Sequence, residues 1–64
     1  MPVIKRQVLL NYKGENHIYY KMARSDAQAL LLAQFTLEEE LGLVRGALKH
    51  YFINKPGSWE VHII

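Results

Sequence analysis

The run of residues 25–42, SDAQALLLAQFTLEEELG, is the sequence feature that most constrains the fold of this chain. Ser25 can accept a hydrogen bond from the first helical turn, and Gln28 stands three residues later, where a capping box needs it. Gly42 suits the left-handed conformation that ends many helices. Apolar residues recur between these ends at intervals of three to four. We therefore predict a helix over residues 25–42, long enough to cover one face of a sheet.

The chain has 64 residues, of which 50% are hydrophobic and none is cysteine. A domain of this size buries only about 60% of the surface that its unfolded chain exposes. Without cysteine, neither disulfides nor thiolate metal sites can add stability. We expect a single small α+β domain over residues 1–64 that completes the burial of its apolar surface against a partner, with a homodimer as the default.

Charge and hydropathy limit the location and the partners. The formal net charge of +2 is small, so it argues only weakly for a polyanionic partner. No apolar run approaches the roughly 20 residues of a membrane span, and the first residues do not resemble a secretory signal. We expect a complete, soluble, cytoplasmic polypeptide that does not bind membranes.

The first part of the chain predicts a β-hairpin. Residues 3–12, VIKRQVLLNY, and residues 17–22, HIYYKM, flank the polar turn of residues 13–16, which contains a glycine. A register with Tyr12 opposite Ile18 brings apolar side chains together on one face, which we expect to be the core face. The reverse face then carries Leu9, Tyr19 and Lys21.

The segment of residues 43–52 is ambiguous between strand and helix. Its apolar residues have helical spacing, but Gly46 disfavours a helix and the aromatic and β-branched cluster of residues 51–53 favours a strand. The Pro-Gly pair in residues 54–58 suits a type II turn before the final run, WEVHII. We therefore predict a second hairpin, with Ile53 opposite Trp59. The predicted fold is β-β-α-β-β, an antiparallel sheet of about four strands with one helix packed on one face; the alternative is β-β-α-α-β.

The uncovered face of this predicted sheet is the candidate interaction surface. A sheet face in contact with solvent is normally polar, whereas this face would combine apolar side chains with lysines and histidines. The competing interpretation is a one-residue slip of register, which would exchange the two faces. The residues that we expect to contact a partner are Leu9, Tyr19, Lys21, Leu48, His50, Phe52 and His62.

The three histidines, His17, His50 and His62, raise the question of a metal site, and the predicted register places His50 opposite His62. No acidic residue stands at a recognisable ligand spacing from them. The chain also has no glycine-rich phosphate loop, no Gly-x-Ser-x-Gly motif, no HExxH motif and no cysteine nucleophile. We expect a protein that is not an enzyme and that holds no metal and no cofactor.

Two functions agree with this pattern. The first is a non-enzymatic interaction module or accessory subunit, homodimeric through the open sheet face or through an edge strand. The alternative is weak binding of single-stranded RNA on the same face, with bases stacked on Tyr19 and Phe52 and phosphates held by lysines.

Overall fold

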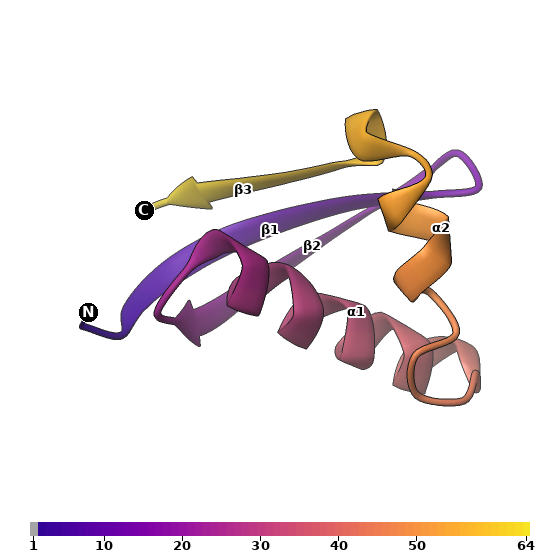
Figure 1. The fold of residues 1–64 in the computed structure, drawn as a ribbon, viewed down its shortest axis with the longest axis horizontal. Helices are drawn as coiled ribbons and strands as arrows, with labels where there is room; N and C mark the ends of the chain where they lie inside the picture. Colours follow the sequence, from indigo (N-terminus) through magenta and orange to yellow (C-terminus); the bar gives the residue numbers. More distant parts are fainter. Residues whose placement is uncertain (1) are drawn as a thin grey trace.

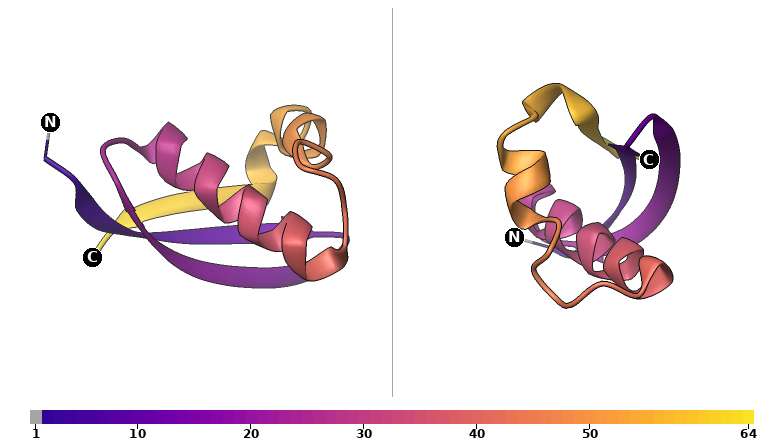
Figure 2. Two further views of the ribbon diagram at one scale, coloured as in Figure 1. Left: turned by 90° about the horizontal axis from the view of Figure 1, so that it is seen from below. Right: turned by 90° about the vertical axis from the view of Figure 1, so that its right-hand side faces the viewer.

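A computed structural model describes residues 2–64 of the chain. It contains strands β1 (Ile4–Tyr12) and β2 (Glu15–Ala23), helices α1 (Asp26–Leu41) and α2 (Lys49–Ile53), the 3-10 turn η1 (Pro56–Ser58) and strand β3 (Trp59–Ile63). The three strands form one antiparallel sheet in the order β2-β1-β3 (Figure 1). Both helices lie on the same side of this sheet, and its other side is uncovered (Figure 2).

The β1–β2 hairpin is closed by a two-residue turn. Lys13 and Gly14 both have positive φ, 52° and 85°, as a type I′ turn requires at its two central residues. This turn pairs Tyr12 with Glu15, and the ladder continues in the same register to Ile4 and Ala23. The predicted pairing of Tyr12 with Ile18 is wrong, because it leaves five residues between the paired positions, whereas the structure closes the hairpin with two.

Helix α1 follows the prediction at both ends. The Ser25 side chain accepts a hydrogen bond from the Gln28 amide at 3.1 Å, and the Gln28 side chain accepts one from the Arg24 amide at 2.7 Å. Gly42 is left-handed, with φ 71°, and ends the helix. The amides of Gly42 and Leu43 bond back to the carbonyls of the last turn.

The predicted third strand does not form, because part of this segment is the short helix α2, so the sheet has three strands instead of four. The chain follows the order of the alternative, β-β-α-α-β, with η1 inserted before the last strand. Gly46 does not oppose this helix, because it lies in the preceding loop with φ 92°. Pro56 and Gly57 belong to η1, so the predicted type II turn of a second hairpin is also wrong, and Trp59 pairs with Leu10 instead of Ile53.

A buried carboxylate organises the loop between the two helices. Glu38 of α1 is only 2% exposed. Its oxygens accept hydrogen bonds from the backbone amides of Gly46, at 3.0 Å, and Leu48, at 2.9 Å. Glu38 therefore holds the start of α2 against α1, and this contact brings Leu48 and Phe52 into the core.

The core lies between the sheet and the helices. Arg6 extends from β1 under the start of α1, where its guanidinium donates to the Asp26 carboxylate at 2.6 Å and to the Ala23 carbonyl at 3.4 Å. This buried arginine joins the sheet to the first turn of the helix. The fully buried apolar side chains are those of Val8, Leu10, Ala23, Ala29, Ala33, Leu37, Leu48 and Phe52.

No helix within residues 2–64 is both long enough and apolar enough to cross a membrane.

We predict that Glu38→Gln lowers the free energy of unfolding by about 1–3 kcal/mol, because a neutral amide oxygen is a weaker acceptor than the carboxylate and the new NH2 group would face the Gly46 amide, which is itself a donor. Glu39→Gln, on an exposed neighbour, is the matched control and should change stability by less than about 0.5 kcal/mol. Urea unfolding followed by circular dichroism measures both values. Equal stabilities of the two variants would contradict the role given to Glu38.

Candidate protein-interaction surface

Strand β2 is a long and unprotected edge of the sheet. It is at one end of the strand order, and its nine residues pair with β1 without a bulge. It contains no proline, and its one lysine, Lys21, turns to the helix side and donates to the Thr36 hydroxyl at 2.6 Å. Proteins usually protect an edge of this kind with a bulge, a proline or an outward charge. None of these devices is found in the described strand, so its backbone is open to another strand.

The tight turn determines which backbone groups of β2 are free. In a two-residue hairpin the flanking residues, Tyr12 and Glu15, bond to each other, and bonded and unbonded pairs then alternate along the ladder. By this alternation the amides and carbonyls of Asn16, Ile18, Tyr20 and Met22 point away from β1. The unpaired backbone groups and the open-face side chains of β2 therefore belong to the same four residues.

These side chains form an apolar row along the edge of the open face. Ile18, Tyr20 and Met22 are 53%, 56% and 59% exposed. Leu9 lies beside Ile18 on β1 and is partly exposed. An uncovered sheet face with consecutive large apolar residues is typical of an interaction site. We call Leu9, Ile18, Tyr20 and Met22 the open-face row.

Polar side chains from all three strands surround the open-face row. The Lys5 ammonium lies 5.4 Å from the centre of the Tyr20 ring, and the Gln7 amide donates to the Tyr20 hydroxyl at 3.4 Å. The side-chain amides of Asn11 and Asn16 share a hydrogen bond of 2.9 Å. The polar residues of this face are Lys5, Gln7, Asn11, Asn16, Glu60 and His62.

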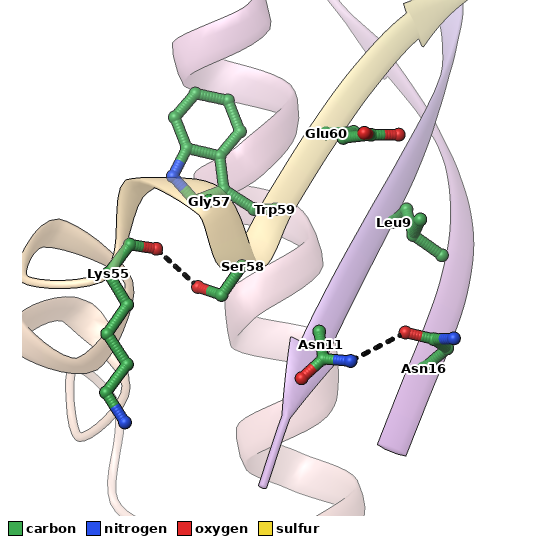
Figure 3. A pocket seen from close by; sticks show the side chains of 8 residues that line it. All are labelled: Leu9, Asn11, Asn16, Lys55, Gly57, Ser58, Trp59 and Glu60. Atoms are coloured by element: carbon green, nitrogen blue, oxygen red, sulfur yellow. Dashed lines mark hydrogen bonds between the residues drawn. The ribbon is translucent and has the colours of Figure 1, made fainter. Parts of the chain in front are cut away.

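An open hollow of about 400 Å³ lies where this face meets η1. Figure 3 shows Leu9, Asn11 and Asn16 on one side of it and Lys55 and Ser58 on the other. The Ser58 hydroxyl donates to the Lys55 carbonyl at 2.5 Å, so it is used within the turn. The Lys55 ammonium lies 4.4 Å from the centre of the Tyr51 ring. The hollow therefore presents scattered polar groups, and they do not form a catalytic arrangement.

The opposite face of β2 is fixed to α1. Tyr19 donates a hydrogen bond to the Glu40 carboxylate, and the Lys21 ammonium lies 5.9 Å from the centre of the Tyr19 ring. Burial raises the pKa of Tyr19 above its ordinary value of 10.0, and the hydrogen bond and negative charge of Glu40 raise this pKa further. These contacts fix the edge strand to the helix.

Five of the seven residues predicted on the open face lie elsewhere. The register of the tight turn places Tyr19 and Lys21 on the helix side. The formation of α2 buries Leu48 and Phe52, which are 2% and 1% exposed, and places His50 on that helix. Only Leu9 and His62 lie on the open face as predicted.

The predicted register places Ile18, Tyr20 and Met22 on the core face, but the structure exposes these three side chains. The signal that could have corrected this assignment is Lys13-Gly14, because glycine tolerates positive φ and a two-residue turn is the commonest hairpin connection. That turn inverts the two faces of β2 relative to the predicted register.

The three histidines lie on three different elements, β2, α2 and β3. His62 pairs with Gln7 across the β1–β3 ladder, so the predicted pairing of His62 with His50 is wrong. The His62 imidazole lies 3.2 Å from the Glu60 carboxylate, and that of His17 lies 3.9 Å from the Glu15 carboxylate. Within residues 2–64 no three histidine or acidic side chains are close enough together to hold a metal ion.

Comparisons with family models, with curated proteins and with solved structures found no match to this chain. The functional argument therefore depends on the chain's own residues.

We predict that the stability of the protein falls as the pH rises above about 10 and that Tyr19→Phe reduces this fall. The folded state raises the pKa of Tyr19, so the stabilising contribution of the neutral phenol is complete below the unfolded pKa of about 10 and is lost as the pH rises toward the folded pKa. Urea unfolding at about pH 9 and about pH 11 measures the loss in each protein. Tyr20→Phe, on the open face, is the control and should behave like the wild type. The same loss in all three proteins would contradict this role of Tyr19.

Proposed function

We propose that this chain is a non-enzymatic interaction module that forms a homodimer by antiparallel pairing of β2 with β2 of a second copy. The observation that carries the proposal is the nine-residue edge strand, whose outward backbone groups belong to residues with exposed apolar side chains. Pairing would satisfy these backbone groups and would bring together the open-face rows of two copies.

A twofold axis restricts the register of such a dimer. Residues that face each other in an antiparallel pair lie on the same side of the sheet, so even-numbered residues of β2 must face even-numbered residues. The register centred on Tyr20 sets the two Tyr20 rings side by side and places Ile18 opposite Met22 of the second copy. Cross-strand pairs of aromatic and large apolar side chains are favourable.

Electrostatics favours the same register. On the helix side it sets Lys21 opposite Tyr19 of the second copy, which repeats between copies the lysine–tyrosine contact that each chain already makes. A shift of the axis to Lys21 would place two lysines opposite each other. Like charges that face each other directly destabilise a strand pair.

Helix α1 supports the proposed interface. Thr36 and Glu40 bond to β2, so the flank of α1 beside the edge carries these residues and Leu32, one turn earlier. A second copy would bring its own α1 antiparallel to the first. Because Glu40 contacts Tyr19 and Thr36 contacts Lys21, an axis through Tyr20 would place Glu40 of one copy near Thr36 of the other.

Weak binding of single-stranded RNA is the competing function, and it now has less support. Phe52 is buried and the Tyr19 hydroxyl is bonded to Glu40, so neither ring lies on the open face as a stacking platform. Tyr20 with Lys5 remains there, but Glu60 adds a negative charge to the same face. Binding of RNA normally needs several rings and an excess of positive charge.

We predict that Tyr20→Pro converts the dimer into a monomer. The Tyr20 amide points away from β1, so proline removes a bond between copies and leaves the β1–β2 ladder in place. The loss of two hydrogen bonds at the axis should raise the dimer dissociation constant about a hundredfold. Light scattering over a range of concentrations should give twice 7.5 kDa for the wild type and 7.5 kDa for the variant.

Tyr20→Val is the matched control, because it removes the ring but keeps the amide, and it should remain dimeric at high concentration. Circular dichroism checks that both variants fold. A wild-type chain that stays at 7.5 kDa at millimolar concentration would contradict the proposed dimer. So would a Tyr20→Pro variant that folds and still forms dimers.

A further inference from the structure

The other edge of the sheet, β3, runs beside an apolar hollow on the helix side. The hollow has a volume of about 250 Å³, which is below the roughly 300–1,000 Å³ of most small-molecule sites. It is lined by Leu30 and Gln34 of α1, Phe52 and Ile53 of α2, and Trp59 of β3. Its size suits one aliphatic side chain.

The backbone of β3 is free on the side that faces away from β1. The β1 residues that bond to β3 are the odd-numbered ones, because the even-numbered ones bond to β2. Leu9 and Gln7 pair with Glu60 and His62, so the amides and carbonyls of Trp59, Val61 and Ile63 point outward. An added strand would bond to these groups and would direct alternate side chains to the helix side, where the hollow lies.

Gln34 provides a polar group in this hollow. The residue is only 5% exposed, and its side-chain amide forms no hydrogen bond with residues 2–55 or 57–64. Among the described residues, every fully buried side-chain polar atom has a hydrogen-bond partner. The amide of Gln34 is therefore not fully buried, and it accounts for part of the 5% exposure of this residue. A buried amide without a partner is costly. A ligand with backbone amides and carbonyls would offer the Gln34 amide a hydrogen bond inside the hollow.

The charge beside the hollow is positive. Arg45 lies over the Phe35 ring and Lys55 over the Tyr51 ring, so the positive charge assigned to this rim is that of Lys49. Lys49 stands one helical turn before Ile53, so these two residues share a face of α2. Ile53 lines the hollow and is 61% exposed. A partner with acidic residues would therefore be attracted to this rim.

We propose that the β3 edge and this hollow bind an extended acidic peptide segment of another protein. The segment adds to β3 as a further strand, places one aliphatic side chain in the hollow and bonds to the Gln34 amide. This site is at the opposite edge of the sheet from β2, so the proposed dimer leaves it free. The two proposals can therefore fail independently.

The fluorescence of Trp59, the only tryptophan of the chain, reports occupancy of the hollow. The probe is a capped heptapeptide of threonines with a leucine at its centre and an aspartate at each end; its twin has lysines in place of the aspartates. We expect a saturable shift of the emission with the acidic peptide and about tenfold weaker binding of the basic one. No change of emission at millimolar peptide, or equal binding of both peptides, would overturn the proposal.

Lys49→Glu should reverse the preference between the two peptides. Lys5→Glu changes the net charge equally but lies on the open face, so it should leave the preference unchanged. A change of preference that is the same in both variants would mean that only the net charge matters, which overturns the assigned position.

Methylation of the peptide backbone tests strand addition without altering the protein. An N-methyl group on the residues whose amides face β3 should abolish binding, whereas a group on the intervening residues should have little effect. Equal effects of the two patterns would overturn strand addition. A further outcome is a wild-type dimer that Val61→Pro disrupts and Tyr20→Pro does not. In that case a second copy occupies this edge, and the peptide proposal is wrong.

Discussion

The left-handed backbone of Lys13 and Gly14 determines which side chains of β2 the protein exposes. Because the side chains of a strand alternate, a change in the length of this turn by one residue would exchange the two faces of β2. With the two-residue turn, Tyr19 and Lys21 face the helix and Ile18, Tyr20 and Met22 face outward. The same turn sets the hydrogen-bonding pattern, so the free backbone groups and the exposed apolar side chains coincide in the same residues. The candidate interaction surface is a consequence of this one constraint.

Polar contacts then hold the helices on the other side of the sheet. Arg6 joins β1 to the first turn of α1, and Glu38 joins the end of α1 to the start of α2. Tyr19 fixes the edge strand to α1 through Glu40. In a chain of 64 residues these contacts do part of the work that a larger core would do. Since they all lie on the helix side, they leave the open face and both sheet edges available.

The sequence was sufficient for the parts of the fold that depend on local signals. Ser25, Gln28 and Gly42 define the ends of α1 because capping involves only neighbouring residues. The first hairpin was also predictable, but its register was not, because the apolar residues of β2 can be arranged on either face and only the turn conformation decides between them. The helix α2 could not be distinguished from a strand, since its start is held by hydrogen bonds that backbone amides donate to Glu38, ten residues before Leu48. The candidate surface was therefore predicted as a sheet face with apolar residues, while most of its predicted members lie elsewhere.

The most direct test of this account is hydrogen exchange of the β2 amides, followed by NMR at two protein concentrations. The amides of Tyr19 and Lys21 bond to β1 and should be protected at both concentrations. Those of Ile18, Tyr20 and Met22 point outward, so they should be protected in the concentrated sample, where β2 is paired with a second copy, and should exchange rapidly in the dilute one. Rapid exchange of these three amides at both concentrations would contradict the account.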